Sequence, residues 1–279
     1  MASELRVGVL GCANIAHKNV RAIGLADGVR LVAVASRSAD KAARFLSECG
    51  LPEVGEIRVV DYEALVADDE VDALYIPLPS GLHVPWVVKA AEAGKHILLE
   101  KPLCLTGAEL EEMWAALEGA RVAVLDGTMF MHHPRMDKLH EEIGKLGGAL
   151  EVNASFSFQA GKEWLENDVR GKKDMDGLGC LGDLGWYTTK LALSVFGFEL
   201  PVGVMAQPGS QTNTQGVLKK GGGTLVWADG RLARLDYSFV NPLIQDATIA
   251  CQGGTIRMSD FVLPRDEVHC ELYVERDPQ

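Results

Sequence analysis

The chain contains no apolar run that approaches the ~20 residues of a membrane-spanning helix. Its six cysteines form no C-x-x-C pair, the spacing that is typical of zinc sites and redox motifs. The first apolar segment begins by Leu5, so we expect no leader peptide. These absences predict a cytoplasmic protein with reduced thiols and no membrane partner.

Positive charge is also scarce. Lys and Arg number 27 against 39 Asp and Glu, so the formal net charge is −12. An acidic chain is a poor partner for nucleic acid, and any phosphate site must be local. His132 and His133 are adjacent but lack an accompanying Cys or carboxylate cluster. We therefore expect no metal site.

The N-terminal segment carries the most informative pattern. An apolar run, Leu5–Leu10, ends at Gly11, and a helical pattern follows directly. This strand–turn–helix order places a dinucleotide pyrophosphate on the first turn of a helix, where free N–H groups and the helix dipole favour an anion. The spacing is not a clean G-x-G-x-x-G, so an ordinary glycine-containing turn is the alternative. The candidate cofactor contacts here are Gly8, Gly11, Ala13, Asn14 and Ile15.

Strand and helix patterns alternate up to Asp126, as in a parallel sheet with crossover helices. After that point, alternating strands and turn signals predict an α+β region with a mainly antiparallel, open sheet. We therefore predict an α/β domain over residues 1–127 and a second, α+β domain over residues 128–279. Expected elements include strands at Ala73–Ile76, His96–Leu99 and Ala247–Cys251, helices at Pro134–Lys145 and Leu184–Phe196, a capping box at Thr106 and Glu109, and a hairpin tip at Lys219–Gly223.

The end of the second predicted strand bears on the choice of dinucleotide. Enzymes that prefer NAD place a carboxylate there, on the ribose 2′-hydroxyl. This strand instead ends in Ser36-Arg37-Ser38, with Lys41 one turn later. An arginine fork matches a phosphate, so we predict NADP, with NAD still possible. A solvated Arg37 at a strand end is the alternative.

Several motifs in a fixed order resemble the Gfo/Idh/MocA oxidoreductases, particularly the plant and algal branch near dihydrodiol dehydrogenase and glucose–fructose oxidoreductase. They are Ala33–Ser38, Ile76–His83, Leu99-Glu-Lys-Pro102, Asp126–Pro134, Asn167–Arg170 and Gly182-Asp-Leu-Gly-Trp-Tyr187. The resemblance implies an N-terminal Rossmann domain that binds NAD(P). It also implies a second domain that carries the substrate site and forms a homo-oligomer through its sheet.

The resemblance further implies a reaction at a secondary alcohol or carbonyl of a sugar, cyclic polyol or dihydrodiol, with catalytic residues Lys101, Asp183 and Tyr187. Tyr187 would be the general acid or base; because a phenol has an unperturbed pKa of ~10, it needs a nearby cation, which Lys101 would supply. Asp183 would orient the lysine or bind a substrate hydroxyl. The alternatives are a surface lysine, a helix cap at Asp183 and, at Tyr187, an interface aromatic whose hydroxyl is bonded to backbone.

Other positions receive weaker assignments. Pro77, Leu78, His83, Glu100 and Lys101 are expected on the cofactor side, although a structural histidine is equally compatible. Arg170 is expected to reach the cofactor phosphates, and its alternative is an ion pair with Asp168 or Asp174. The expected substrate contacts are Phe130, His133, Trp164 and Trp186; the tryptophans could equally be core residues.

Relatives in this branch usually continue into a C-terminal helix, which we expect this chain to lack because it ends at Gln279. Two other function classes compete with the enzyme. A non-catalytic NADP(H)-binding sensor or scaffold would not need the proton-relay residues. A methyltransferase should carry an acidic residue where Ser36-Arg37-Ser38 stands.

Overall fold

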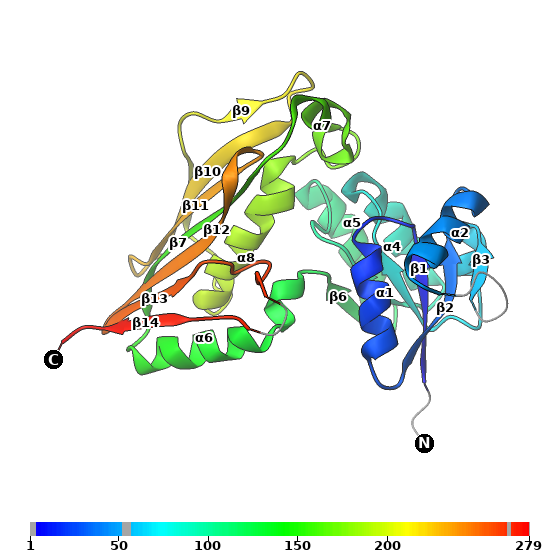
Figure 1. The fold of residues 1–279 in the computed structure, drawn as a ribbon, viewed down its shortest axis with the longest axis horizontal. Coiled ribbons are helices and arrows are strands. Elements are labelled where there is room, and N and C mark those ends of the chain that lie inside the picture. Colours follow the sequence, from blue (N-terminus) through cyan, green and yellow to red (C-terminus); the bar gives the residue numbers. More distant parts are fainter. Residues whose placement is uncertain (1–3, 52–56, 267–268, 279) are drawn as a thin grey trace. The chain divides into compact units, whose positions relative to one another are not determined.

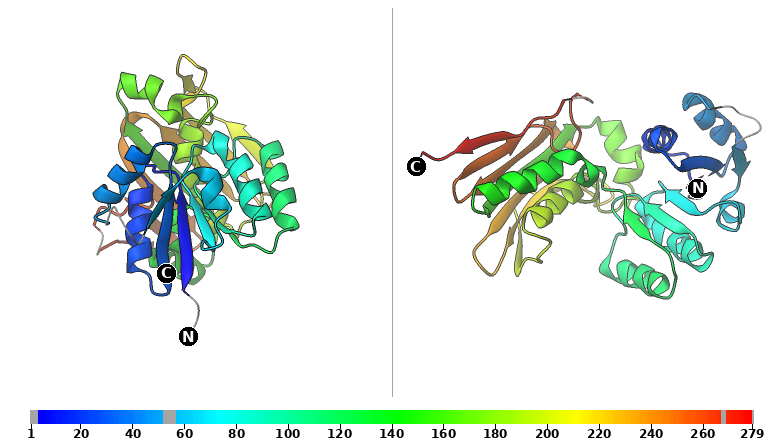
Figure 2. Two further views of the ribbon diagram at one scale, coloured as in Figure 1. Left: turned by 90° about the vertical axis from the view of Figure 1, so that its right-hand side faces the viewer. Right: turned by 90° about the horizontal axis from the view of Figure 1, so that it is seen from below.

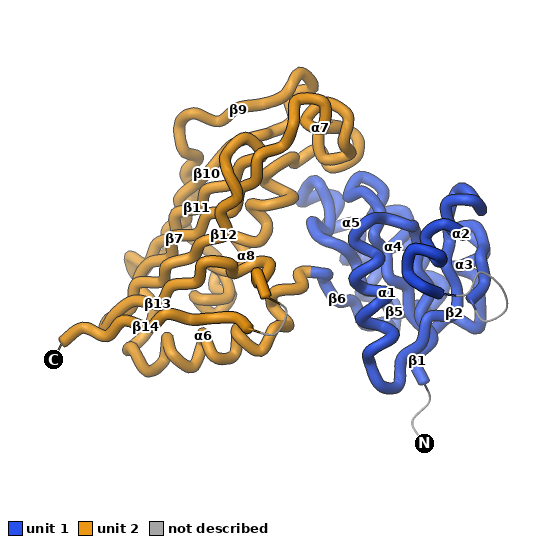
Figure 3. The backbone as a smooth tube through the Cα atoms, viewed as in Figure 1, with its two compact units in different colours: residues 1–127 blue, residues 128–279 orange. Residues whose placement is uncertain are grey.

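The computed structural model describes residues 4–51, 57–266 and 269–278. The chain divides into two compact units, residues 1–127 and 128–279 (Figure 3). No helix in the described part of the chain combines the length and hydropathy that a membrane span requires.

Unit 1 is built on a six-stranded parallel sheet in the order β3-β2-β1-β4-β5-β6 (Figure 1). Its strands are short apolar runs, because helices cover both faces of the sheet. The order reverses between β1 and β4, and ligands of such sheets bind at the carboxyl ends of the strands on either side of that point. The strands are β1 Leu5–Leu10, β2 Val29–Ala35, β3 Arg58–Val60, β4 Ala73–Ile76, β5 His96–Leu99 and β6 Val124–Asp126.

Helices pack on each face of this sheet (Figure 2). On one face, α1 (Ala16–Leu25) and α2 (Ala39–Glu48) bury residues such as Val20 and Phe45 against β1 and β2. On the other face lie α3 (Tyr62–Val66), the 3₁₀ turn η1 (Ser80–Leu82), α4 (His83–Glu92) and α5 (Gly107–Glu118). The predicted capping box of Thr106 and Glu109 is present at the start of α5.

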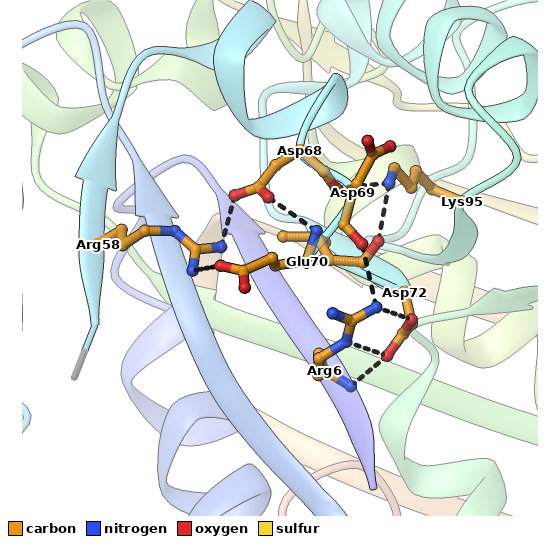
Figure 4. A network of polar contacts seen from close by, with 8 residues as sticks. Arg6, Arg58, Asp68, Asp69, Glu70, Asp72 and Lys95 are labelled. Atoms are coloured by element: carbon orange, nitrogen blue, oxygen red, sulfur yellow. Dashed lines mark hydrogen bonds and ion pairs between the residues drawn. The ribbon is translucent and has the colours of Figure 1, made fainter. Parts of the chain in front are cut away.

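Ion pairs and hydrogen bonds of charged residues connect the amino ends of these strands (Figure 4). Arg6 of β1 donates to both carboxylate oxygens of Asp72, at 2.7 and 2.9 Å. Arg58 of β3 pairs with Asp68 and Glu70. Buried Lys95 donates to the carbonyls of Asp68 and Val71, at 2.6 and 2.8 Å. This network stabilises the amino ends of the strands, whereas ligands of such sheets bind at the carboxyl ends.

Unit 2 contains an eight-stranded sheet in the order β14-β13-β12-β7-β11-β10-β8, with β9 paired to β10. Neighbouring strands run antiparallel apart from β7 and β11, which are parallel. The predicted fold class is therefore confirmed. The strands are β7 Ala149–Gln159, β8 Gly203–Ala206, β9 Gln211–Thr212, β10 Leu218–Val226, β11 Leu232–Ser238, β12 Val240–Cys251, β13 Gly254–Met258 and β14 Tyr273–Arg276.

Two helices, α6 (Pro134–Lys145) and α8 (Trp186–Val195), pack on one face of this sheet (Figure 1). Leu139 and Leu191 lie in the core beside strand residues such as Val152 and Ile249. Shorter turns complete the unit: η2 Met129–His132, α7 Lys162–Asn167, η3 Val169–Gly171 and the π-helical turn η4 Leu181–Gly185.

The hairpin tip expected at Lys219–Gly223 is wrong. These residues lie inside β10, paired with β11 on one side and, at Gly223, with β8 on the other. A Cβ on Gly222 would come within 2.6 Å of the Leu235 carbonyl oxygen, so glycine permits close strand packing here. The glycine run has the composition of a turn but occupies a strand.

Candidate functional site

The turn after β1 is shaped to receive an anion. Gly11 has φ of +118°, and a Cβ there would lie 2.8 Å from Cδ2 of Leu78. At α1, the N-cap residue Ile15 makes no side-chain cap bond, and the first turn carries no acidic residue. The amide groups and dipole of this helix end are therefore not offset by a local acid, which suits a pyrophosphate. Gly11, Ala13, Asn14 and Ile15 thus fit a dinucleotide.

Gly8, also expected at the cofactor, permits close packing inside unit 1. It lies within β1, where a Cβ would come within 2.9 Å of Leu65 Cδ1 and 3.2 Å of Leu74 Cδ2. These atoms belong to the hydrophobic core under the sheet. Gly8 therefore allows α3 to pack on the sheet, and its side of the strand faces protein.

The residues after β2 form a small polar group. Ser38 caps α2 by accepting the Lys41 N–H at 3.3 Å, and the Ser38 N–H donates to Ser36 Oγ at 3.3 Å. The Arg37 side chain is exposed. The thiol of Cys12 lies near both Ser36 and Lys41, and burial raises the pKa of Cys12. This group brings two hydroxyls and two cations to the carboxyl end of β2.

Tyr62 joins this group, although sequence reasoning missed it. Its hydroxyl lies 3.8 Å from the Cβ position of Gly11, and its ring meets Trp86 edge-on at 5.2 Å. Burial raises the pKa of Tyr62, while the charge of Arg37 opposes that rise. Asp61 caps α3 through its side chain and so fixes Tyr62 at the first position of that helix.

A buried network supports the Glu100–Pro102 turn, which includes a cis peptide bond between Lys101 and Pro102. The Tyr75 hydroxyl donates to Glu100 Oε1 at 2.7 Å, and Asn19 of α1 donates to the Tyr75 hydroxyl at 2.6 Å. Glu100 Oε2 accepts the Lys101 N–H at 3.3 Å. Burial raises the pKa of Glu100. Glu100 thus links α1 and β4 to the backbone of Lys101.

His83 supports a loop and does not line a surface. The ring is fully buried, with Nε2 2.8 Å from the Leu78 carbonyl and Nδ1 3.0 Å from the Leu103 carbonyl. It therefore ties the turn after β4, which includes buried Pro77, to the segment after Lys101. These contacts are those of the structural histidine that the sequence left open as an alternative.

In unit 2, Asp183 lies in the π-helical turn η4. The expected α-helix at Leu184 instead begins with this wider turn, a feature frequent at functional sites. The carboxylate pairs with Arg170, whose Nε lies 3.0 Å from Asp183 Oδ2. Arg170 Nη1 also lies 3.0 Å from Asp168 Oδ1. The guanidinium expected at the cofactor phosphates is thus held by two carboxylates of its own unit.

Tyr187 is the second residue of α8, and its ring is buried between two phenylalanines. Its centroid lies 6.0 Å from that of Phe130 and 5.6 Å from that of Phe156. Phe130 itself is buried and meets Phe261 edge-on at 5.8 Å. Phe130, expected to contact substrate, therefore packs behind Tyr187 and fixes its ring.

The remaining candidates of unit 2 are partly buried. Trp164 packs edge-on against Phe239 at 5.1 Å, with the Arg170 guanidinium 5.8 Å from its ring centre. Trp186 Nε1 donates to Thr128 Oγ1 at 2.7 Å. His133, expected at the substrate, caps α6 by accepting the Arg135 N–H at 3.1 Å. A ring used as a helix cap has a structural role.

Among residues 4–51, 57–266 and 269–278, no three His, Cys, Asp or Glu side chains are arranged to hold a metal ion. All six cysteines are free thiols.

Comparison with known proteins identifies the family. A family model described as an oxidoreductase family with an NAD-binding Rossmann fold matches residues 5–128. The Gfo/Idh/MocA C-terminal domain model matches residues 138–257. The chain belongs to the Gfo/Idh/MocA oxidoreductases. The predicted family, and with it the prediction that the chain is an enzyme, is confirmed.

Three members of this family illustrate the likeness. A D-xylose 1-dehydrogenase (NADP(+)) of Haloferax volcanii is 35% identical, over 89% of this chain and 74% of the relative. A dTDP-3,4-didehydro-2,6-dideoxy-alpha-D-glucose 3-reductase of Saccharopolyspora spinosa is 32% identical, over 99% of this chain and 81% of the relative. A 3-ketoreductase of Actinomadura kijaniata, solved with NADP and TDP-benzene, has a TM-score of 0.83 and 28% identity, covering 98% of this chain and 85% of the other.

Proposed function

We propose that this protein is an NADP-dependent oxidoreductase that transfers a hydride between nicotinamide and a secondary alcohol or carbonyl of a sugar, polyol or dihydrodiol. The observation that carries this proposal is the set of residues at the carboxyl ends of β1 and β2 in unit 1. There, the start of α1, which has no side-chain cap, follows Gly11, and Arg37 with its two flanking serines follows β2. The names of two relatives, a dehydrogenase and a ketoreductase, support both the cofactor and the substrate class.

The choice of NADP follows from charge. The cofactor's 2′-phosphate is an anion that an arginine fork can bind through two parallel hydrogen bonds. The backbone after β2 offers Arg37 with the hydroxyls of Ser36 and Ser38, and Lys41 lies on the first turn of α2. A carboxylate that would select NAD is missing from Ser36-Arg37-Ser38.

We assign the proton chemistry to Tyr187, with Lys101 and Asp183 assisting. Bound NADPH supplies the hydride when a carbonyl is reduced. The Tyr187 hydroxyl gives its proton to the carbonyl oxygen, and in the reverse direction the phenolate takes that proton from the alcohol. The Lys101 ammonium stabilises the negative charge that develops on these oxygens. Structures of the Actinomadura relative have been solved with one tyrosine replaced by phenylalanine and with one lysine replaced by alanine or glutamate. The choice of these positions is in line with a role for a tyrosine and a lysine.

For the partner, we propose a second copy of this chain bound through the open face of the unit 2 sheet. Side chains of β7 alternate, so that Val152 and Ala154 enter the core while Asn153 lies on the opposite face. That face continues over β12 to β14, where it forms a hollow of about 470 Å³ that includes Thr248 and Arg257. Light scattering of the purified chain tests this assignment.

The test of the proposed reaction compares Tyr187→Phe with Tyr273→Phe. Removing a general acid or base lowers turnover by about 10²–10⁴-fold, whereas Tyr273 is an exposed residue at the sheet edge. NADPH oxidation would be followed with a panel of ketosugars and ketones, and NADP reduction with the matching alcohols. We expect Tyr187→Phe to lose turnover while it keeps the wild-type affinity for NADPH. Equal turnover in both variants would remove Tyr187 from the mechanism.

A further inference from the structure

Arg170 is held between two carboxylates of unit 2. Its Nε and Nη1 atoms lie 3.0 Å from Asp183 Oδ2 and 3.0 Å from Asp168 Oδ1, respectively. The Asp168 carboxylate also accepts the Arg170 backbone N–H at 3.0 Å. The guanidinium lies 5.8 Å from the ring centre of Trp164, within cation–π range. The Nε and Nη1 atoms of the guanidinium therefore each have a carboxylate partner inside this unit.

The backbone around Arg170 is fixed from a distant part of the chain. The side-chain amide of Asn213 donates to the carbonyls of Leu165 and Gly171, at 3.0 and 2.9 Å. Its oxygen accepts the N–H groups of Gln215 and Val217, both at 3.0 Å. Asn213 thus clamps the segment on either side of Arg170, so the arginine is presented in one place before any substrate arrives.

The groups around Asp183 differ in charge. The carboxylates of Asp183 and Asp168 raise the pKa of Arg170 against the opposing effect of burial. Cys180, in the turn before Asp183, has a pKa raised to about 12 by its burial, so it stays a neutral thiol. The Cys180 thiol in turn contacts the carbonyl of Tyr237 at 3.7 Å. Arg170 is thus a cation that faces the Asp183 carboxylate inside unit 2.

We propose that Arg170 is a positioning residue that keeps Asp183 ionised and fixes the direction of its carboxylate. This inference rests on the proposed function, because it assigns Asp183 a place in that reaction. An Asp183 held as the anion is a hydrogen-bond acceptor for a substrate hydroxyl or for the catalytic lysine. It cannot donate the proton, which leaves that step to Tyr187. Arg170 then acts through Asp183, and cofactor phosphates are not its ligands.

The first test is the pH dependence of kcat/KM in Arg170→Met and Arg170→Lys. Methionine keeps much of the apolar stem and removes the charge. Loss of a neighbouring cation raises the pKa of a carboxyl group, by about one to three pH units for a close pair. The acidic limb of the profile should therefore move to higher pH in Arg170→Met, with the affinity for NADPH unchanged. Arg170→Lys should restore most of the limb, since it restores the charge.

A second measurement does not depend on turnover. The Asp183 carboxyl can be titrated by NMR with ¹³C-labelled aspartate, using Asp183→Asn to assign its resonance. We expect it to titrate at higher pH in Arg170→Met than in wild type. Arg44→Met, which removes an exposed arginine of α2 in unit 1, is the control and should leave the resonance in place.

The outcomes separate this inference from the proposed function. If the Asp183 carboxyl titrates identically in wild type and Arg170→Met, the positioning role is wrong. If Arg170→Met instead weakens the affinity for NADPH and leaves the acidic limb of the pH profile in place, Arg170 binds the cofactor phosphates and the positioning role is wrong. If the carboxyl titration moves as expected but wild type turns over no substrate in the panel, the arginine–carboxylate assignment holds and the proposed reaction fails.

Discussion

The ion pair between Arg135 and Asp260 gives a sharp test of how unit 2 is held together. Arg135 is the second residue of α6, and its Nη1 lies 2.6 Å from Asp260 Oδ1. Its Nη2 donates to the carbonyls of Asp260 and Phe261, both at 3.0 Å. The two charged side chains are only 3% and 11% exposed. Arg135→Met would leave a mostly buried carboxylate without its countercharge and two carbonyls without this donor.

Breaking a buried pair on one side costs about 3–5 kcal/mol. With a urea slope of about 2 kcal/mol/M, the unfolding midpoint should fall by roughly 1.5–2.5 M. Tryptophan fluorescence reports this transition, because Trp164, Trp186 and Trp227 all lie in unit 2. The control is Arg234→Met, which breaks a 2.7 Å pair with Glu151 whose partners are 47% and 41% exposed. Such surface pairs contribute about 1 kcal/mol or less.

The double variant Arg135→Met/Asp260→Leu should recover part of the loss, because it removes the unpaired carboxylate as well. The reasoning would be refuted if Arg135→Met lowered the midpoint no more than Arg234→Met does.

Three further predictions concern unit 1. Arg6 lowers the pKa of Asp72 to about 2. The ionised carboxylate therefore stabilises the fold above its unfolded pKa of ~3.9, and this stabilisation is lost as the pH falls towards 2. Asp72→Asn should flatten the dependence of Tm on pH in that range, and an unchanged slope would contradict this. His83→Ala should lower stability by about 2 kcal/mol or more by leaving buried carbonyls unpaired, which urea unfolding measures. Tyr75→Phe removes the hydroxyl donor to Glu100 and should cost about 1–3 kcal/mol by the same measurement; a neutral result would show that Glu100 does not need it.

Local signals were sufficient for much of the fold. Strands β4 and β5 and helix α6 have the bounds that the sequence predicts, because short apolar runs and a proline at the helix start mark them. The capping box of α5 is likewise local, since it joins residues three apart. The alternation of strands and helices up to Asp126 was enough to predict a parallel sheet.

The errors in unit 2 arise where composition and tertiary context disagree. The glycine run in β10 looks like a turn, yet neighbouring strands on both sides order it. Strand β12 begins at Val240, whereas the sequence predicted a start at Ala247. Asn241 and Pro242 are uncommon inside strands, so the first part of β12 has no strand pattern. Strand β14 has no strong apolar pattern, since it lies at the sheet edge and is mostly exposed.

The site shows the same division. Motif order along the chain was enough to propose Lys101, Asp183 and Tyr187. The residues that support them come from far away in the sequence: Asn19 and Tyr75 reach Glu100 from 81 and 25 positions away. No periodic or local pattern announces such contacts.

Residue type also left several roles undecided. A histidine suits a cofactor site, a helix cap or a buried clamp, and only the packing assigns His133 to the second and His83 to the third. Phe130 was predicted as a substrate contact from its residue type, which could not show that its ring is buried against Tyr187 and Phe261. Arg170 had an ion pair among its alternatives, but its pairing with Asp183 depends on the π-helical turn.

The measurement that tests the central claim most directly is a fluorescence titration of the purified chain with NADPH and, separately, NADH. The same titrations would be run on Arg37→Glu and on the matched control Arg44→Glu, which makes the same charge change on an exposed residue of α2. A charge-assisted hydrogen bond contributes about 1.5–3 kcal/mol, or roughly a 10- to 150-fold change in Kd. We predict that wild type and Arg44→Glu prefer NADPH by at least tenfold and that Arg37→Glu loses the preference. Equal affinity of wild type for both cofactors, or an unchanged preference in Arg37→Glu, would contradict the assignment of this site to NADP.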